Sequence, residues 1–158
     1  MSQQEIRLIV RVLNTDLDGS KKVPYSLAGI RGVGINFGYA VARAIGIDPE
    51  LRLGQLSDQQ IAQIEDCIRN PAKYGIPQWM YNRRNDLVTG KDLHLVGPDL
   101  ELTIREDIQR EMRIRSWRGV RHSLGLKVRG QRTRTTGRKG GPVGVARRAA
   151  EEAAREKK

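Results

Sequence analysis

The side chains best suited to binding chemistry lie in a basic run toward the carboxyl end of the chain. Residues 112–150 contain twelve basic residues and no carboxylate, whereas the rest of the 158-residue sequence contains 17 basic and 18 acidic residues. The whole net charge of +11 therefore lies in this run, which repels itself unless a polyanion neutralises it. Most of its basic residues are arginines, whose planar guanidinium group binds phosphate through two hydrogen bonds and stacks on bases. The run therefore predicts nucleic-acid binding.

Two other interpretations of the basic run are weaker. A solvated linker usually mixes charge signs, and this run contains no acid. A membrane surface requires an apolar face, and the run has few large apolar residues. His122 lies beside Arg121, so we interpret it as a base-stacking or phosphate contact and not as an acid–base group. The candidate RNA contacts of the run are Arg115, Arg118, Arg121, His122, Lys127, Arg129, Arg132, Arg134, Arg138 and Lys139.

A second candidate site is the hairpin of residues 29–34 (Gly-Ile-Arg-Gly-Val-Gly), which precedes an apolar helix pattern over residues 37–45. Glycines let a backbone approach a phosphate closely, and the N–H groups at the start of the following helix would point at that phosphate. Arg31, Gly32 and Gly34 are therefore candidate contacts to a nucleic-acid backbone. The alternative is that these glycines only make a tight turn between two packed helices, and the sequence does not decide between the two. A dinucleotide site is disfavoured because no strand precedes the glycines.

Catalytic and metal-binding patterns are missing from the sequence. Cys67, His94 and His122 are the only cysteine and histidines, and they are too few and too far apart in sequence for a zinc site. Cys67 falls in an apolar helix pattern and is expected in the core, and a single cysteine fits a reducing compartment. His94 is expected at the surface or at a sheet edge. We therefore expect no enzymatic activity, no cofactor and no metal, in a cytoplasmic protein that makes no membrane contact.

The elements that must position these residues are mainly helical. An apolar alternation over residues 6–12 predicts a strand, which should end at turn-forming residues 14–19. Ser57 and Gln60 have the spacing of a capping box at the start of a helix. The other expected elements are helices over residues 25–28 and 37–45, a β-hairpin over about 76–96, and a long helix that opens at Gly97 and carries an apolar stripe of Leu100, Ile104, Ile108 and Met112.

The chain is expected to divide into a helical core, residues 1–125, and a basic tail, residues 126–158. The β-hairpin at about 76–96 is an insertion in the core. After Gly125, glycine recurs every few residues and no apolar periodicity remains. Such a segment cannot bury enough apolar surface to offset its ordering entropy, so we expect it to be extended and to fold only against its partner. Residues 143–157 have the composition of a short final helix.

One long motif resembles a known family. It contains Arg118-Gly119-Val120-Arg121-His122 and continues as Gly125-Leu126-Lys127-Val128-Arg129-Gly130-Gln131-Arg132-Thr133-Arg134-Thr135. This motif is similar to the signature of the universal small-subunit ribosomal protein thirteen family. The similarity covers residues 6–145, including the hairpin at 30–34, the segment at 104–107, and residues 135–138 and 143–145.

A group of residues in the middle of the chain resembles an insertion shared by archaeal and eukaryotic members of that family. These residues are Asn70, Pro71, Tyr74, Ile76, Pro77, Trp79, Asn82, Arg83, Thr89, Gly90 and Lys91. The acid-containing end of the chain, residues 151–158, is less similar to the eukaryotic ending. The resemblance is therefore to the archaeal/eukaryotic type, with the archaeal type preferred.

The resemblance implies both a fold and a function. Members of the family have a helix–two-turns–helix core and lie in the head of the small ribosomal subunit. They bind small-subunit rRNA, contact a neighbouring head protein and bridge elements of the large subunit, and extend a basic tail toward the peptidyl tRNA. By matched motif, the rRNA contacts would come from residues 31–34 and 115–139, and residues 134–139 would approach the tRNA.

The alternative function is a non-catalytic helix-hairpin-helix protein that binds DNA. Repair glycosylases with a similar core are a separate class, because they need a zinc finger with four cysteines. This chain has only Cys67, so that class of enzyme is excluded.

Overall fold

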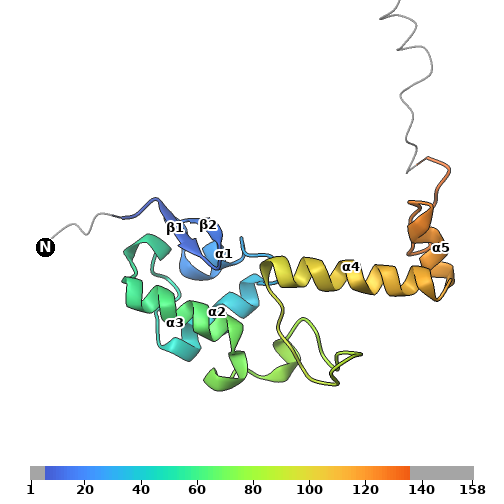
Figure 1. Ribbon diagram of the computed structural model, residues 1–158. Helices are drawn as coiled ribbons and strands as arrows, with labels where there is room; N and C mark the ends of the chain where they lie inside the picture. The colour runs from blue at the N-terminus through green and yellow to red at the C-terminus, as the bar shows by residue number, and fades with distance from the viewer. Residues whose placement is uncertain (1–5, 136–158) are drawn as a thin grey trace, which may run out of the picture. The chain divides into compact units, whose positions relative to one another are not determined.

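The chain divides into two compact units, Met1–Ile104 and Arg105–Lys158, of which the computed structural model describes residues 6–135 (Figure 1). The described fold is mainly helical, as predicted, with a small antiparallel hairpin near its amino end. Helix α4 begins in the first unit and ends in the second. In chain order the elements are β1 (Ile9–Val12), β2 (Thr15–Asp18), α1 (Val23–Leu27), α2 (Ile35–Ile45), η1 (Leu53–Gln55), α3 (Asp58–Arg69), η2 (Pro71–Tyr74), η3 (Gln78–Met80), α4 (Gly97–Arg113) and α5 (Trp117–Ser123), where η marks a short 3₁₀ helix.

Strands β1 and β2 form a hairpin in which Ile9 pairs with Asp18. Its turn consists of Leu13 and Asn14, which both have positive φ (47° and 60°), as a tight two-residue hairpin turn requires. The predicted strand is therefore confirmed over β1. The expectation that residues 14–19 only end the strand was wrong, because Leu13 and Asn14 form the turn and Thr15–Asp18 pair with β1 as strand β2.

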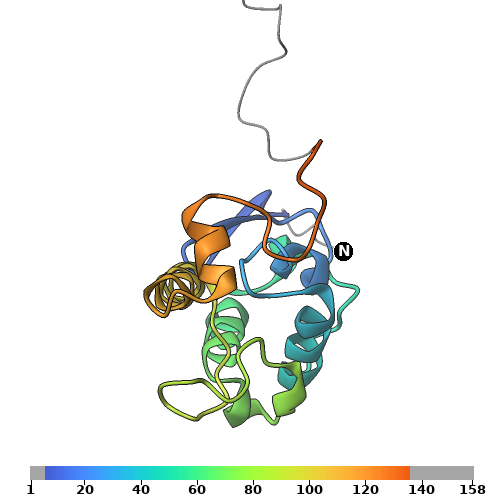
Figure 2. The ribbon, with the colours of Figure 1, turned by 90° about the vertical axis from the view of Figure 1, so that its right-hand side faces the viewer.

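Helices α1, α2 and α3 enclose the core of the first unit, and α2 and α3 lie side by side (Figure 2). Helix α2 ends at Gly46, which has φ 78°. Helix α3 begins with the predicted capping box: the Gln60 N–H donates to Ser57 Oγ (3.3 Å) and the Ser57 N–H donates to Gln60 Oε1 (3.0 Å). Cys67 is buried in the core, as predicted. The largest fully buried side chains include Leu27, Ile30, Leu53, Ile64 and Ile68.

Residues 76–96, all of them described, fold back on themselves but form only one backbone bridge where a β-hairpin was predicted. That bridge joins Arg83 and Leu93 through two N–H···O bonds of 3.2 and 2.8 Å. At the next position the Asn82 side chain takes the place of a backbone, because its Nδ2 donates to the Leu95 carbonyl (2.6 Å) and its Oδ1 accepts from the Leu95 N–H (2.9 Å). A side chain that fills this rung prevents the ladder from extending.

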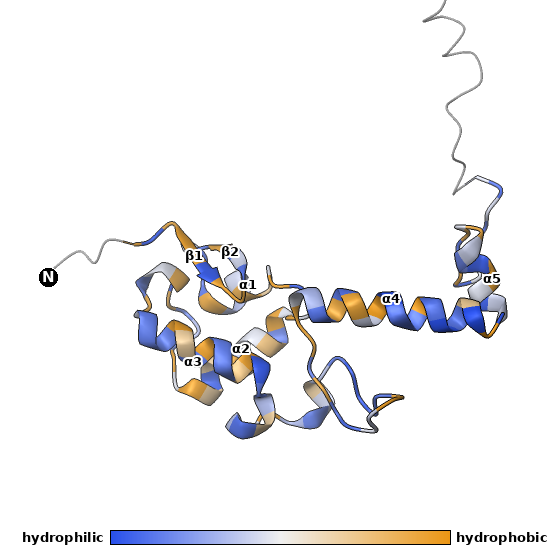
Figure 3. Cartoon of the chain, in the orientation of Figure 1, coloured by the Kyte–Doolittle hydropathy of each residue, from blue (hydrophilic) through white to orange (hydrophobic). Residues whose placement is uncertain are grey.

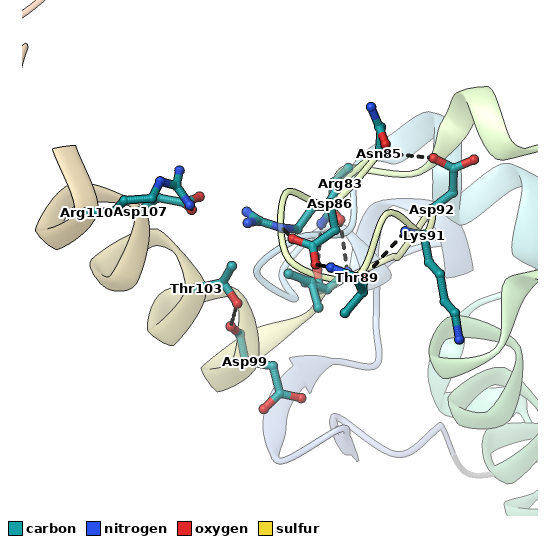
Figure 4. Close-up of polar contacts among 12 residues, drawn as sticks. Arg83, Asn85, Asp86, Thr89, Lys91, Asp92, Asp99, Thr103, Asp107 and Arg110 are labelled. Carbon is teal, nitrogen blue, oxygen red and sulfur yellow. Dashed lines mark hydrogen bonds and ion pairs between the residues drawn. The ribbon is translucent and has the colours of Figure 1, made fainter. Parts of the chain in front are cut away.

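Side-chain contacts fix the tip of this insertion (Figure 4). The Asp86 carboxylate accepts hydrogen bonds from Arg83 Nε (2.7 Å) and from the N–H (2.9 Å) and Oγ1 (2.8 Å) of Thr89. The bond from Arg83, followed by those from Thr89, holds the pKa of the Asp86 carboxyl well below its usual range. The Asn85 N–H donates to Asp92 Oδ1 (2.8 Å). The loop therefore keeps its shape without a regular β-ladder.

Helices α4 and α5 meet at a tight corner in the second unit. Arg115 turns the chain with a positive φ of 56°. Ser116 then caps α5, because its Oγ accepts the Gly119 N–H (3.0 Å) and donates to the Glu111 carboxylate (2.5 Å). A Cβ at Gly119 would lie only 2.1 Å from the Glu111 carbonyl oxygen, so the close approach of the two helices requires glycine.

The apolar stripe predicted on α4 is present and only partly covered, since Ile104 and Met112 are exposed and Leu100 and Ile108 are half-buried. Apolar and polar segments alternate along the helix (Figure 3), and among the described parts of the chain no residue of α4 is buried. Over the residues that the structure describes, no helix is long and apolar enough to cross a membrane. Residues 126–135 form no regular element, and the helix predicted over 143–157 lies outside the described residues. The division into a core of 1–125 and a tail of 126–158 stays a prediction.

Candidate nucleic-acid interface

The glycine hairpin connects α1 and α2, and its apolar residues anchor it in the core. Ile30 and Val33 are buried. The backbone turns through hydrogen bonds from the Ile30 N–H to the Leu27 carbonyl (3.0 Å) and from the Val33 N–H to the Ile30 carbonyl (3.1 Å). This alternation leaves Arg31 and Gly34 exposed at the surface, in the arrangement expected of a backbone-binding hairpin.

Gly32 is required by the packing of the chain itself. Its φ is +98°, a conformation that side-chain-bearing residues rarely adopt. A Cβ at this position would lie 2.4 Å from the Leu95 carbonyl oxygen and 3.2 Å from the Val96 Cα. The neighbouring Arg31 carbonyl accepts the Gly97 N–H (2.8 Å), so the hairpin is fixed to the end of the insertion. The packing of the chain therefore explains the glycine at position 32 without any contact to a nucleic acid.

Gly34 is different, because nothing in the described chain requires a glycine there. Its backbone is extended (φ −97°, ψ 168°), and no heavy atom lies within 4 Å of a Cβ built on it. It is the N-cap of α2, and neither a side-chain cap nor an acidic residue satisfies the first turn of that helix. The first N–H groups of an α-helix have no partner inside the helix and attract anions. Gly34 therefore leaves open the space through which a phosphate would reach these donors.

Arg31 already has a partner within the chain. Its guanidinium forms an ion pair with Glu101 of α4, and both side chains are more than a third exposed. An exposed pair of this kind contributes little to stability, because water and salt screen it. Arg31 can therefore exchange Glu101 for a phosphate at little cost.

The candidate basic residues of the second unit follow α4: Arg115 lies at the corner, and the other described ones lie on α5 and on the segment after it. Arg121 is the best anchored, because its Nε donates to the Lys127 carbonyl (2.9 Å) and its guanidinium carbon lies 5.8 Å from the centre of the Trp117 ring. Most of the predicted contacts are exposed and Arg121 and His122 are half-buried; the described ones are Arg115, Arg118, Arg121, His122, Lys127, Arg129, Arg132 and Arg134. Arg138 and Lys139 lie outside the described residues. The hairpin belongs to the first unit and this basic segment to the second, and each is a candidate surface of its own unit.

His94 is not at a surface or sheet edge, where it was predicted, but against the core. Its ring stacks on Phe37 with centroids 3.9 Å apart and planes 13° apart, and neither ring nitrogen has a hydrogen-bond partner within the described residues. Burial lowers the pKa of His94 to about 4, and it raises the pKa of the Cys67 thiol to about 11. Both groups are neutral near pH 7 and act as core residues. No cluster of three or more metal-ligating side chains occurs in the described part of the chain.

Two features of the interface had no clear signal in the sequence. The pairing of Arg31 with Glu101 joins residues seventy positions apart, and charge pattern alone does not predict it. Trp117 lies on the surface with 75% of its area exposed, and the sequence does not show whether this ring packs in a core or remains free to stack. Guanidinium groups and the N–H groups at a helix start are both of the kind that bind anions in proteins.

Comparison with known proteins agrees with the motif at residues 118–135. Residues 11–139 match the family model described as ribosomal protein S13/S18. The chain is 57% identical to the small ribosomal subunit protein uS13 of Staphylothermus marinus over 147 residues, which cover 93% of this chain and 97% of that protein. It is 59% identical to the protein of the same name from Hyperthermus butylicus over 145 residues, with coverage of 92% and 96%. For the corresponding protein of Methanopyrus kandleri the identity is 51% over 150 residues, with coverage of 94% and 99%. These relatives are archaeal, in line with the preference drawn from the sequence. With a family match over most of its length and relatives of this similarity, the chain belongs to the ribosomal protein S13/S18 family.

Proposed function

We propose that the chain is a non-enzymatic structural constituent of the small ribosomal subunit and that it binds small-subunit rRNA. Its relatives carry the name small ribosomal subunit protein, and each matches this chain over more than nine-tenths of its own length. The observation on this chain that carries the proposal is the set of exposed arginines on α5 and residues 124–135, in a stretch without a carboxylate. Phosphates of an RNA backbone supply the missing negative charge.

The glycine hairpin is the second proposed RNA contact. The unfilled space at Gly34 and the uncapped first turn of α2 support a backbone phosphate bound by N–H groups. Arg31 would join this phosphate after leaving Glu101. Such contacts position RNA without reading its sequence, as a structural component of a large RNA assembly requires.

The other proposed partners follow from the family. The partly exposed apolar stripe of α4 supports contact with a neighbouring protein of the subunit head, because an apolar helix face in an assembly is usually buried against protein. Elements of the large subunit are also proposed partners, through inter-subunit bridges. The tail, with Arg134, Arg138 and Lys139, would reach the peptidyl tRNA. The proposed location is the cytoplasm, in the ribosome.

Sedimentation tests the proposal. In a lysate of the source cells the chain should travel with small subunits through a sucrose gradient and dissociate only at high salt, because phosphate contacts weaken as salt rises. A chain that stays at the top of the gradient in low salt would contradict the proposal. Competition then separates RNA from DNA: small-subunit rRNA should displace the chain from duplex DNA of equal phosphate concentration. Preference for the DNA would support the helix-hairpin-helix DNA-binding alternative.

A further inference from the structure

We propose that Trp117 is a stacking platform for an unpaired base of the bound RNA. The inference rests on the proposed RNA binding and adds a residue that contacts bases to a surface otherwise suited to phosphates. Trp117 is the first residue of α5, and 75% of its area is exposed. Exposure of so large a ring is unfavourable in water, so a partner that covers it stabilises the complex.

The backbone beneath Trp117 is fixed before any partner binds. Ser116 caps the helix through the Gly119 N–H (3.0 Å) and also donates to Glu111 at the end of α4. Gly119 lies so close to the Glu111 carbonyl that α5 cannot shift toward α4. Only the side-chain torsions of Trp117 remain free, which keeps the ordering entropy of a stacking contact small.

The charges around the ring favour a nucleic acid over a protein as the covering partner. The Arg121 guanidinium lies 5.8 Å from the ring centre, and Arg118 and His122 belong to the same helix. No acidic residue occurs between Met112 and Ala150. A protein that covered Trp117 would have to neutralise this charge with its own acids, whereas RNA offers a base face and phosphates together. Aromatic rings within a basic surface are the usual platforms for single-stranded bases.

A protein partner remains the competing outcome, because α5 and its C-cap residue also carry exposed apolar side chains. Val120 and Leu124 are exposed and lie three and seven positions further along the chain. These aliphatic side chains cannot stack, and they would pack on an apolar protein surface. The two outcomes differ in what naked RNA does to the ring.

Trp79 provides a matched control in the same chain. It lies in η3 of the first unit and is 70% exposed, close to the exposure of Trp117, but no basic run surrounds it. The full-length Trp79→Phe variant therefore reports fluorescence from Trp117 alone, and the full-length Trp117→Phe variant reports Trp79 alone. Titration with poly(U) should quench the first variant and leave the second unchanged. Polyphosphate, which has no bases, should neutralise the charge without quenching either variant.

Affinity for a small-subunit rRNA transcript provides the second readout. Trp117→Leu should weaken binding roughly 5- to 100-fold, the usual loss on removing a stacked aromatic ring. Trp117→Tyr, which keeps a ring, should lose less, and Trp79→Leu should bind as the unaltered chain does. The dependence on salt should be the same for all three, because no charge is changed.

Two results would overturn the stacking platform. One is that the Trp117→Leu variant binds naked rRNA as tightly as the unaltered chain, whether or not the variant still enters subunits. The ring would then be covered by a protein and not by a base. The other is equal quenching by polyphosphate and poly(U). Either result leaves the proposed function intact if binding still falls with salt. Failure of the unaltered chain to bind rRNA at low salt would instead contradict the proposed function itself.

Discussion

Gly32 and Gly34 of the hairpin should respond differently to the same substitution. Gly32→Ala adds a Cβ to a residue at φ +98°, and that Cβ would lie 2.4 Å from the Leu95 carbonyl oxygen. A left-handed backbone costs a non-glycine residue about 1–2 kcal/mol, and a contact this short adds about 1–3 kcal/mol through the shifts it forces. We therefore expect Gly32→Ala to lower the free energy of unfolding by about 2–5 kcal/mol.

Gly34→Ala should leave stability nearly unchanged. Alanine is a poorer N-cap than glycine, at a cost of about 0.5–1 kcal/mol. The backbone of Gly34 is extended and a Cβ there meets open space, so alanine fits without strain. Alanine also lowers the conformational entropy of the unfolded chain, which stabilises the folded state by about 0.4–1 kcal/mol. The net change in the free energy of unfolding should be within about 1 kcal/mol of zero.

Among folded chains, Gly34→Ala should lose more affinity for rRNA than Gly32→Ala, although it loses less stability. If a phosphate approaches the first N–H groups of α2 past Gly34, the added methyl lies in its path. Loss of a charge-assisted hydrogen bond there should weaken rRNA binding about tenfold. Chemical denaturation and titration with an rRNA transcript measure the two quantities separately. Normal rRNA binding by Gly34→Ala would refute a phosphate bound at the first N–H groups of α2. A loss of stability in Gly34→Ala equal to that in Gly32→Ala would refute it as well.

Two further predictions concern groups inside each unit. His94→Phe should remove part of the acid sensitivity of the first unit: burial lowers the pKa of His94 to about 4, so as pH falls from about 6.5 to about 4 the unfolded chain takes up a proton that the folded chain does not. The contribution of His94 to the free energy of unfolding should therefore be fully present above pH 6.5 and fall by about 1–2 kcal/mol over that window, allowing for the partial exposure of the ring. Denaturation at pH 7 and at pH 4.5 should show a smaller difference in stability for the variant than for the unaltered chain. An equal difference would refute this assignment. Gly119→Ala should separate α5 from α4, because its Cβ would lie 2.1 Å from the Glu111 carbonyl oxygen. Hydrogen exchange should then speed up over residues 117–123 and not over 35–45, and protection unchanged at both would count against the close packing.

Local signals in the sequence predicted the end of α2 and the start of α3, but α5 (Trp117–Ser123) had not been predicted. Ser57 and Gln60 are three positions apart, and the hydrogen bonds of their capping box depend on nothing outside that turn. Gly46 ends α2 in the left-handed conformation for an equally local reason. The second strand was missed because its polar residues resemble a turn, and only pairing with β1 decides their structure.

Contacts between distant residues were beyond the reach of the sequence. The insertion lacks a regular hairpin because the Asn82 side chain occupies a rung opposite Leu95. His94 lies against the core because Phe37, 57 positions earlier, offers it a stacking surface. In the candidate interface the arginines were predictable from charge alone, but the distinct roles of Gly32 and Gly34 required the positions of their neighbours.

The salt dependence of rRNA binding tests the central claim most directly. Affinity of the full chain for a small-subunit rRNA transcript should fall about a thousandfold or more between 50 and 200 mM salt if roughly six to ten phosphates are neutralised. A chain truncated after Gly125 should keep its helical fold, since residues 126–135 belong to no helix or strand, and should show a much flatter dependence of log affinity on log salt. Equal affinity and an equal slope for the full and truncated chains would contradict the assignment of binding to the basic run.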